Sequence, residues 1–267
     1  MTKARSLSRT RSSELTSGQA NNTSSIRAFL EETRLLLIGK GPRVVFWDSV
    51  HLKEYPRLPH IKLIAPMPHL DVSLPAAIER RRSATAGFSR ANLSPVELST
   101  LLRWSCGMRS GGGISDFRRV YPSAGARYPL EVYPIVLRCS GIPPGLYHYA
   151  PTKHSLVCLL GKDLTQLLVS ATSDERIVSA GLVIVLTGVF GRTTEKYGAR
   201  GLRYVLIEVG HVAQNLALVA TALGLASYSI GGFVDEEIDG LLDTQNELED
   251  PLCLFAVGKP PRYNVRS

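Results

Sequence analysis

The sequence Pro122-Ser123-Ala124-Gly125-Ala126-Arg127-Tyr128-Pro129-Leu130-Glu131-Val132-Tyr133 joins a turn of small residues directly to a strand. Small side chains in the first four positions would let a flat ring approach the backbone closely. The β-branched and aromatic residues that follow predict a strand over residues 131–137. The stretch therefore indicates a strand whose leading loop could bind a ligand, although by itself such a loop is only a turn.

Strand and helix patterns extend on both sides of this stretch. Further strands are expected at 145–149 and 155–160, joined by a turn at 151–153, and at 181–190, 226–230 and 252–257. Helices are expected at 76–82, 95–106, 163–171 and 202–223, and Asp235 is expected to cap a short helix. In the second helix Ser94, Pro95 and Glu97 form a capping-box pattern. The absence of strict βαβ alternation predicts an α+β domain.

The helix predicted at 202–223 is apolar on most sides. Both of its flanks are therefore expected to be buried, either in the centre of the core or in a subunit interface. The sequence alone leaves these two placements open.

The charge of the 267-residue chain, +8 overall, is concentrated at its start. Residues 1–45 carry eight Lys or Arg and three Glu, and the first 26 are polar without periodicity. We expect a disordered basic tail over 1–43 and one domain over 44–267. Because the excess charge lies in the tail, nucleic acid is not an expected partner, although the tail could dock an acidic one.

Several classes of protein are not expected. No apolar run reaches the roughly 18 residues of a membrane span, and no secretory signal is evident, so we expect a cytoplasmic protein. The four cysteines are far apart and the six histidines lack a metal-ligand spacing. We therefore predict no metal site. The dinucleotide fingerprint GxGxxG and the P-loop are also missing.

Three short segments could carry chemistry. Lys196-Tyr197 supplies two groups able to move protons, because burial can push a lysine toward neutrality and a neighbouring cation lowers a tyrosine pKa. Taken on its chemistry alone, the same pair is more often part of a basic helix start. Arg80-Arg81-Arg82-Ser83 could hold a phosphate, and the backbone of Gly231-Gly232 could meet a ring edge. Taken singly, each has an ordinary structural explanation.

In this order and spacing the segments resemble the nitroreductase-like FMN flavoenzymes, and among them the SagB-type azoline dehydrogenases. The resemblance covers roughly residues 45–262. It rests on Arg81-Arg82-Ser83, the stretch 122–133, Gly145-Leu146-Tyr147-His148-Tyr149, Lys196-Tyr197-Gly198, residues 210–216, Gly231-Gly232-Phe233 and Val257-Gly258-Lys259-Pro260. Thr85 departs from the family pattern, which has a cation there, and Arg82 could substitute for it.

The resemblance implies a nitroreductase-like fold, with a mixed sheet flanked by helices and FMN at the interface of a homodimer. Arg81, Arg82 and Ser83 would contact the flavin phosphate, with Lys259 or Arg262 completing that site. Pro122, Ser123, Ala124 and Gly125 would line the ring, with Gly231 and Gly232 near its edge. Lys196 and Tyr197 match the pair implicated in azoline dehydrogenation.

The resemblance further implies a thiazoline or oxazoline substrate, in a peptide or on a carrier, that is oxidised to the azole in natural-product biosynthesis. A cyclodehydratase or synthetase would be the partner. Two other functions stay open from the sequence: an NAD(P)H-dependent nitro- or quinone reductase, and an interaction subunit of a peptide-modifying complex.

Overall fold

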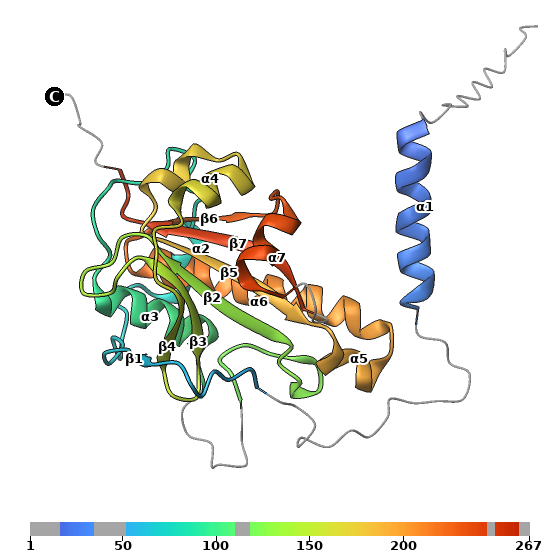
Figure 1. The fold of residues 1–267 in the computed structure, drawn as a ribbon, viewed down its shortest axis with the longest axis horizontal. Helices are drawn as coiled ribbons and strands as arrows, with labels where there is room; N and C mark the ends of the chain where they lie inside the picture. The colour runs from blue at the N-terminus through green and yellow to red at the C-terminus, as the bar shows by residue number, and fades with distance from the viewer. Residues whose placement is uncertain (1–16, 35–51, 110–117, 245–248, 262–267) are drawn as a thin grey trace, which may run out of the picture.

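A seven-stranded sheet forms the centre of the protein (Figure 1). The structure, a computed structural model, describes residues 17–34, 52–109, 118–244 and 249–261. The strand order is β1-β4-β3-β2-β5-β7-β6, and each neighbouring pair is antiparallel. The strands are β1 His60–Lys62, β2 Leu130–Val136, β3 Gly145–Ala150, β4 Ser155–Leu160, β5 Leu182–Val189, β6 Ala226–Ile230 and β7 Glu249–Gly258. In the described ranges, parallel pairing is limited to isolated bridges, including one between Ser83 and Ser227.

Helices cover both faces of the sheet. They are α1 Ser17–Glu32, α2 Leu74–Arg80, α3 Pro95–Cys106, α4 Thr165–Thr172, α5 Gly191–Tyr197, α6 Arg200–Ala222 and α7 Asp235–Leu242, with 3₁₀ turns η2 Ala124–Ala126 and η3 Glu175–Ser179. Side chains of β5 alternate between two cores: Ile184 packs with α3 and α6, whereas Val183 and Val185 pack with α4 and α7. Burial on both faces explains the continuous apolar run of this strand. The predicted α+β class is confirmed.

The start of α3 follows the sequence closely. The Ser94 hydroxyl accepts the backbone N–H of Glu97 at 3.3 Å, and the Glu97 carboxylate accepts the Ser94 N–H at 2.8 Å. The capping box is thus complete. The prediction for α7 was wrong in detail, because Asp235 is the first helical residue and its side chain does not cap the helix.

The long helix α6 is buried on one side only. Val205, Val212 and Leu216 lie in the core, whereas Leu206 and Ile207 are 48% and 55% exposed. The expectation that both flanks are buried is therefore wrong for the single chain. By length and composition alone this helix could cross a membrane, but its buried side is packed against α3 and the sheet.

The helix α1 corrects the prediction of a disordered tail for residues 17–32; residues 1–16 and 35–51 lie outside the described part. It stands at the side of the body and meets it near the start of α6 (Figure 1). Arg203 of α6 donates to the Thr33 hydroxyl at 2.6 Å and to the Leu30 carbonyl at 2.8 Å. These bonds satisfy groups at the helix C-terminus, a contribution that sequence periodicity cannot show.

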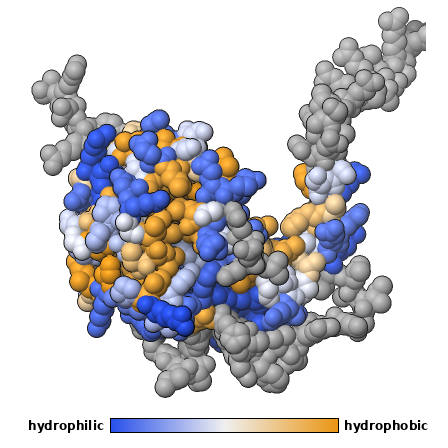
Figure 2. Space-filling model, viewed as in Figure 1, coloured by the Kyte–Doolittle hydropathy of each residue, from blue (hydrophilic) through white to orange (hydrophobic). Residues whose placement is uncertain are grey.

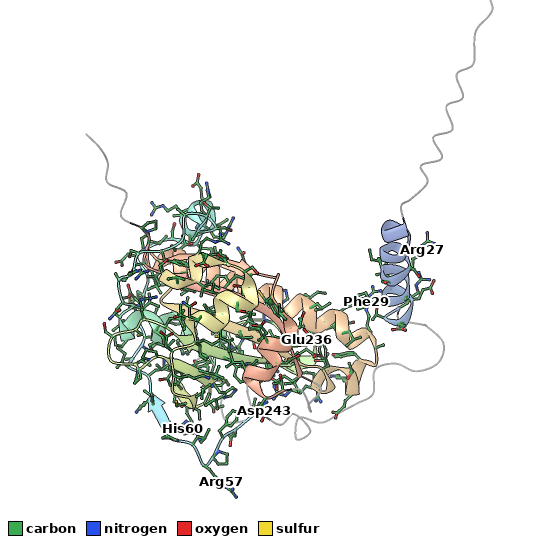
Figure 3. All side chains as sticks on the ribbon, turned by 45° about the horizontal axis from the view of Figure 1, so that its top comes forward. Arg27, Phe29, Arg57, His60, Glu236 and Asp243 are labelled. Atoms are coloured by element: carbon green, nitrogen blue, oxygen red, sulfur yellow. The ribbon has the colours of Figure 1, made fainter. Side chains whose placement is uncertain are left out.

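Apolar side chains accompany this contact. Phe29 lies on the side of α1 that faces the body (Figure 3), and the Arg203 guanidinium is 5.8 Å from the centre of its ring. Ile26, Phe29 and Leu30 nevertheless remain 60%, 37% and 42% exposed. Figure 2 shows apolar residues on the described lower part of α1 and on the adjoining end of the body.

Candidate active site

The two residues Lys196 and Tyr197 lie directly against the small-residue loop. If Gly125 carried a Cβ atom, that atom would lie 2.5 Å from the Tyr197 hydroxyl and 2.9 Å from the Lys196 ammonium nitrogen. The backbone of Gly125 is left-handed, with φ of +59°. Glycine is therefore required both for its conformation and for the approach of these two side chains.

Two buried arginines fix α5 against this loop. Arg127 donates to the Arg192 carbonyl at 2.6 Å and contacts Glu195 at 3.4 Å. In return, the Arg192 guanidinium donates to the Tyr128 carbonyl at 3.2 Å and to Glu131 at 2.6 Å. Arg127 follows the loop and Arg192 belongs to α5, so these bonds fix the position of α5 relative to the loop.

The buried carboxylate of Glu131 strengthens this arrangement. It also pairs with His148 of β3 at 2.8 Å. Burial alone would raise the pKa of Glu131, but the hydrogen bond with His148 and the charge of Arg192 outweigh it and hold the pKa at about 2. The carboxylate is thus ionised at neutral pH and anchors α5 to β2.

Aromatic groups surround the candidate catalytic pair. The Lys196 ammonium is 5.4 Å from the centre of the Tyr197 ring, and the rings of Tyr197 and Tyr204 meet edge to face at 5.1 Å. Both members of the pair are half-buried. A cation, a phenol and an open loop surface thus meet in one place, where a substrate proton could be transferred.

A pocket of about 680 Å³ opens beside the loop. It is lined by arginines, aromatic residues and small residues of the loop: Arg109, Arg118, Arg119, Val120, Tyr121, Pro122, Ser123, Gly125, Ala126 and Tyr128. Ala126 and Tyr128 have positive φ angles of 55° and 45°, which non-glycine residues rarely adopt. Strain of this kind is concentrated at functional sites, and here it shapes a pocket wall.

A second pocket, of about 170 Å³, lies at the arginine segment. Its lining comes from Arg81, Arg82 and Ser83, from one face of α6 and from β6. Ser83 is positioned by its bridge to Ser227, and the next residue donates its N–H to the Ser227 carbonyl at 3.0 Å. This pocket shares no lining residue with the pocket beside the loop.

The remaining predicted site residues lie elsewhere. Gly231 and Gly232 are exposed beyond β6 and line neither pocket. The Lys259 ammonium is paired with Glu97 of α3, so its charge is already partly neutralised. Arg262 lies outside the described residues. In the described ranges no cluster of His, Cys, Asp and Glu could hold a metal ion.

Glu208 on α6 is a site residue that sequence reasoning missed. It is 2% exposed, and its Oε1 atom is buried without a hydrogen-bond partner in the described part of the chain. Burial raises its pKa to about 7, against the opposing effects of the nearby Ser123 hydroxyl and of the charges of Arg119 and Arg192. The available signal was an acid inside an apolar helical pattern, since such residues are seldom buried without a reason.

An α+β fold and a pocket beside a loop of small residues, with Lys196 and Tyr197 next to that loop, are features that an oxidoreductase with a bound ring would require. The nitroreductase family model matches residues 78–259. The chain belongs to the nitroreductase family. A nitroreductase-family protein of Methanocaldococcus jannaschii is 38% identical over 190 residues, which cover 71% of this chain and 92% of that protein.

Other similarities extend the comparison. The microcin B17-processing protein McbC of Escherichia coli is 26% identical over 67% of this chain and 68% of its own. The E. coli microcin synthetase McbBCD complex with truncated pro-MccB17 bound contains a chain with TM-score 0.60 and 23% identity, over 91% of this chain and 92% of that one. An Anabaena variabilis nitroreductase structure has TM-score 0.72 and 22% identity over 96% of this chain, which spans half of that protein. Both structures support the predicted fold.

Proposed function

We propose that this chain is an FMN-dependent dehydrogenase that oxidises azoline rings in a peptide to azoles. The observation that carries the proposal is the approach of Lys196 and Tyr197 to Gly125. A proton-transferring pair placed on the loop that would support a flat ring suits a reaction in which one substrate carbon loses a proton and its neighbour loses a hydride.

The residues present suit FMN. Arg81, Arg82 and Ser83 bring guanidinium and hydroxyl donors to one pocket, as a phosphate requires. The loop at 122–125 offers small residues beside the larger pocket, as a flat ring requires. When bound, FMN would accept the hydride. Lys259 would contribute to the phosphate site only if its pairing with Glu97 loosened.

A homodimer would unite the two pockets. The two pockets share no lining residue, and we propose that a ligand with a ring at one end and a phosphate at the other takes each half of its site from a different subunit. The exposed stripe of α6 that includes Leu206, Ile207, Gly210 and His211 offers an apolar contact surface for the second copy. Gly210 also lines the arginine pocket, so this surface and the pocket are continuous.

Tyr197 is the proposed base. Its hydroxyl faces the loop surface, where it would take the proton from the azoline carbon next to the carbonyl-like group. Lys196 lies beside the Tyr197 ring, 5.4 Å from its centre, where its ammonium group would contact the substrate. Arg127 and Arg192 hold the pair in place and take no part in proton transfer.

Two substitutions test the catalytic assignment. Lys196→Ala and Tyr197→Phe should each purify with bound FMN yet fail to remove two hydrogens from an azoline peptide, measured by mass spectrometry. Tyr204→Phe is the matched control, because it keeps the ring that packs on Tyr197 and removes only a hydroxyl; it should remain active. Full activity of both variants of the pair would refute the proposed roles.

The substrate and partners are proposed from relatives. McbC is named as a processing protein of microcin B17, and the related complex holds a truncated precursor of it. We infer a peptide or carrier-bound azoline substrate for this chain, delivered by a cyclodehydratase or synthetase. Pull-down of a cyclodehydratase by this chain, with and without an azoline peptide, tests that inference.

An NAD(P)H-dependent reductase is the alternative that the archaeal relative favours. Anaerobic NADPH should then bleach the bound flavin rapidly, whereas the azoline dehydrogenase should be bleached by its peptide substrate. A purified protein without flavin absorbance would instead favour an interaction subunit.

A further inference from the structure

The seven-residue helix α5, which carries Lys196 and Tyr197, is short enough for contacts at its two ends to decide where its side chains lie. At its start, Arg192 donates to the buried Glu131 carboxylate at 2.6 Å. Soon after its end, α6 begins at Arg200. Residues from the N-terminal part of the chain contact the supports at both of these places.

Residues 52–56, which we call the strap, contact the support at the start of α5. The backbone N–H of Lys53 donates to Oε1 of Glu131 at 3.4 Å, and this is the same oxygen that accepts the hydrogen bond from Arg192. One carboxylate oxygen of β2 therefore binds both the strap and the first turn of α5. A shift of the strap would remove one of the donors that hold this carboxylate in place.

The side chain of Lys53 fixes the strap to a second buried carboxylate. Its ammonium group donates to Glu249 of β7 at 2.8 Å, and Glu249 also accepts from the Tyr133 hydroxyl at 2.8 Å and the Thr187 hydroxyl at 2.6 Å. Glu249 is only 1% exposed. Because a buried carboxylate is costly without a cation, the Lys53 ammonium group has a strong reason to stay in this position.

The end of α1 contacts the support beyond the other end of α5. Thr33, directly after α1, is 0% exposed, although the residues on either side of it are exposed. Its hydroxyl accepts from Nε of Arg203 at 2.6 Å, and its carbonyl accepts from Arg200 at 3.3 Å. Complete burial of one polar residue at the end of an exposed helix indicates a specific contact with the first turn of α6.

This second contact leads to Tyr197 through aromatic packing. The Arg200 guanidinium lies 5.9 Å from the centre of the Tyr204 ring, and the Tyr204 ring meets the Tyr197 ring edge to face at 5.1 Å. The contacts therefore run from Thr33 through two residues of α6 to the phenol of α5. The strap reaches the opposite end of the same helix.

Both supports come from outside the part of the chain that the family model matches, residues 78–259. Thr33 and Lys53 precede that part. The matched residues supply the loop, α5 and α6, but they do not contain the groups that bind Arg203 from α1 or Glu249 from the strap.

We propose that residues 17–34 and the strap together clamp α5 from both ends, and that Thr33 and Lys53 are positioning residues for Lys196 and Tyr197. Loosening either contact would let the pair leave its place against Gly125. The catalytic consequence rests on the proposed function, whereas the clamp itself is a property of the folded chain and can be measured without a substrate.

The first experiment measures hydrogen exchange of the full chain by mass spectrometry, without ligand. Thr33→Val removes one acceptor and leaves α6 unaltered. Lys53→Met combined with Glu249→Gln removes both charges, so no unpaired carboxylate is buried. In each variant, exchange in peptides covering 191–197 should be about fivefold faster, the change in a local opening equilibrium that one hydrogen bond supports, while β5 is unchanged.

Matched controls are available on the same two segments. Arg27 lies on the side of α1 that faces away from the body, and Arg57 lies at the outer edge of the chain beyond the strap (Figure 3). Both side chains are exposed. Arg27→Ala and Arg57→Met should leave the exchange of α5 as it is in the wild type.

The second experiment measures turnover of an azoline peptide by the same variants loaded with FMN. The kcat should fall roughly fivefold with little change in KM, because the pair is less often in place while contacts with the rest of the substrate remain. Thr33→Ser keeps the hydroxyl and Lys53→Arg keeps a cation beside Glu249. These two variants should retain both the slow exchange and the turnover.

The outcomes separate the clamp from the proposed function. Unchanged exchange of α5 in both test variants overturns the clamp, and so does an equal acceleration in α5 and β5, which would mean that the contacts stabilise the whole body. If exchange of α5 is selectively faster but the wild type does not oxidise azoline peptides, the clamp stands and the proposed function fails.

Discussion

Replacing Glu208 with Gln should change how the stability of the protein depends on pH. Folded Glu208 binds its proton more tightly than an exposed glutamate, because burial raises its pKa from 4.5 to about 7. The folded state is therefore penalised when this carboxyl must ionise. The penalty is absent below pH 4.5, grows as the pH rises, and is complete above about pH 7. Glutamine has nearly the same shape and never ionises.

The size of the effect follows from the two pKa values. The difference between 4.5 and about 7, at about 1.4 kcal/mol for each pKa unit, corresponds to about 3 kcal/mol. Part of this penalty is already present at pH 5, so the free energy of unfolding of Glu208→Gln minus that of the wild type should rise by about 2.5 kcal/mol between pH 5 and pH 8. Urea denaturation followed by circular dichroism at four pH values measures this difference directly.

A matched control and a clear negative result complete the test. Glu79→Gln removes an exposed carboxylate from α2 and should leave the pH dependence unchanged. The free energy of unfolding can be plotted against pH for the wild type and for Glu208→Gln. If the two plots run parallel between pH 5 and pH 8, burial has not raised the pKa of Glu208, and the reasoning from its environment is wrong.

Three further substitutions test the geometry of the site and of its surroundings. Gly125→Ala should lower the turnover of the azoline peptide at least tenfold, because the new methyl group would displace Lys196 and Tyr197. Gly141→Ala is the control. The φ angle of Gly141 is also positive, but a methyl group there meets only Pro95, at 4.0 Å. Arg203→Ala should release α1 from the body of the protein. Limited proteolysis before residue 52 should become faster, while the melting temperature of the body stays unchanged. An unchanged cleavage rate would contradict the docking of α1. Gly210→Ala places a methyl group where nothing lies within 4 Å in the single chain. The substitution should therefore stabilise a monomer by about 1 kcal/mol, but it should weaken a dimer that buries this face. Sedimentation velocity and urea denaturation together distinguish the two results.

The fold was predictable where local sequence signals agree with the final packing. The capping box of α3 and the paired strands β3 and β4 need only near neighbours, and both were expected at the observed positions. The helices α1 and α5 were missed because their support comes from distant residues. Arg203 closes the end of α1, and Arg127 binds the Arg192 carbonyl of α5. Long-range hydrogen bonds of this kind leave no periodic pattern in the sequence.

The candidate site was predictable in part for a similar reason. Motifs identify Lys196, Tyr197 and the loop at 122–125, and the structure brings them together. Spacing in the sequence cannot show that the arginine segment lines a separate pocket, nor that Lys259 is paired with Glu97. These facts depend on which face of the sheet each segment reaches.

The helix α6 shows why stability alone does not explain this sequence. Within three residues it has a buried carboxyl at Glu208 and a glycine at Gly210, and each is less favourable in a helix interior than an apolar residue or alanine would be. Both have specific neighbours that account for them. Glu208 lies near the loop residue Ser123 and near Arg119 on the buried side, and Gly210 lines the arginine pocket on the exposed side. Tyr204, one turn earlier, packs on Tyr197. Because one helix carries these neighbours, a change in its position would affect the Lys196–Tyr197 pair, the loop and the second pocket together.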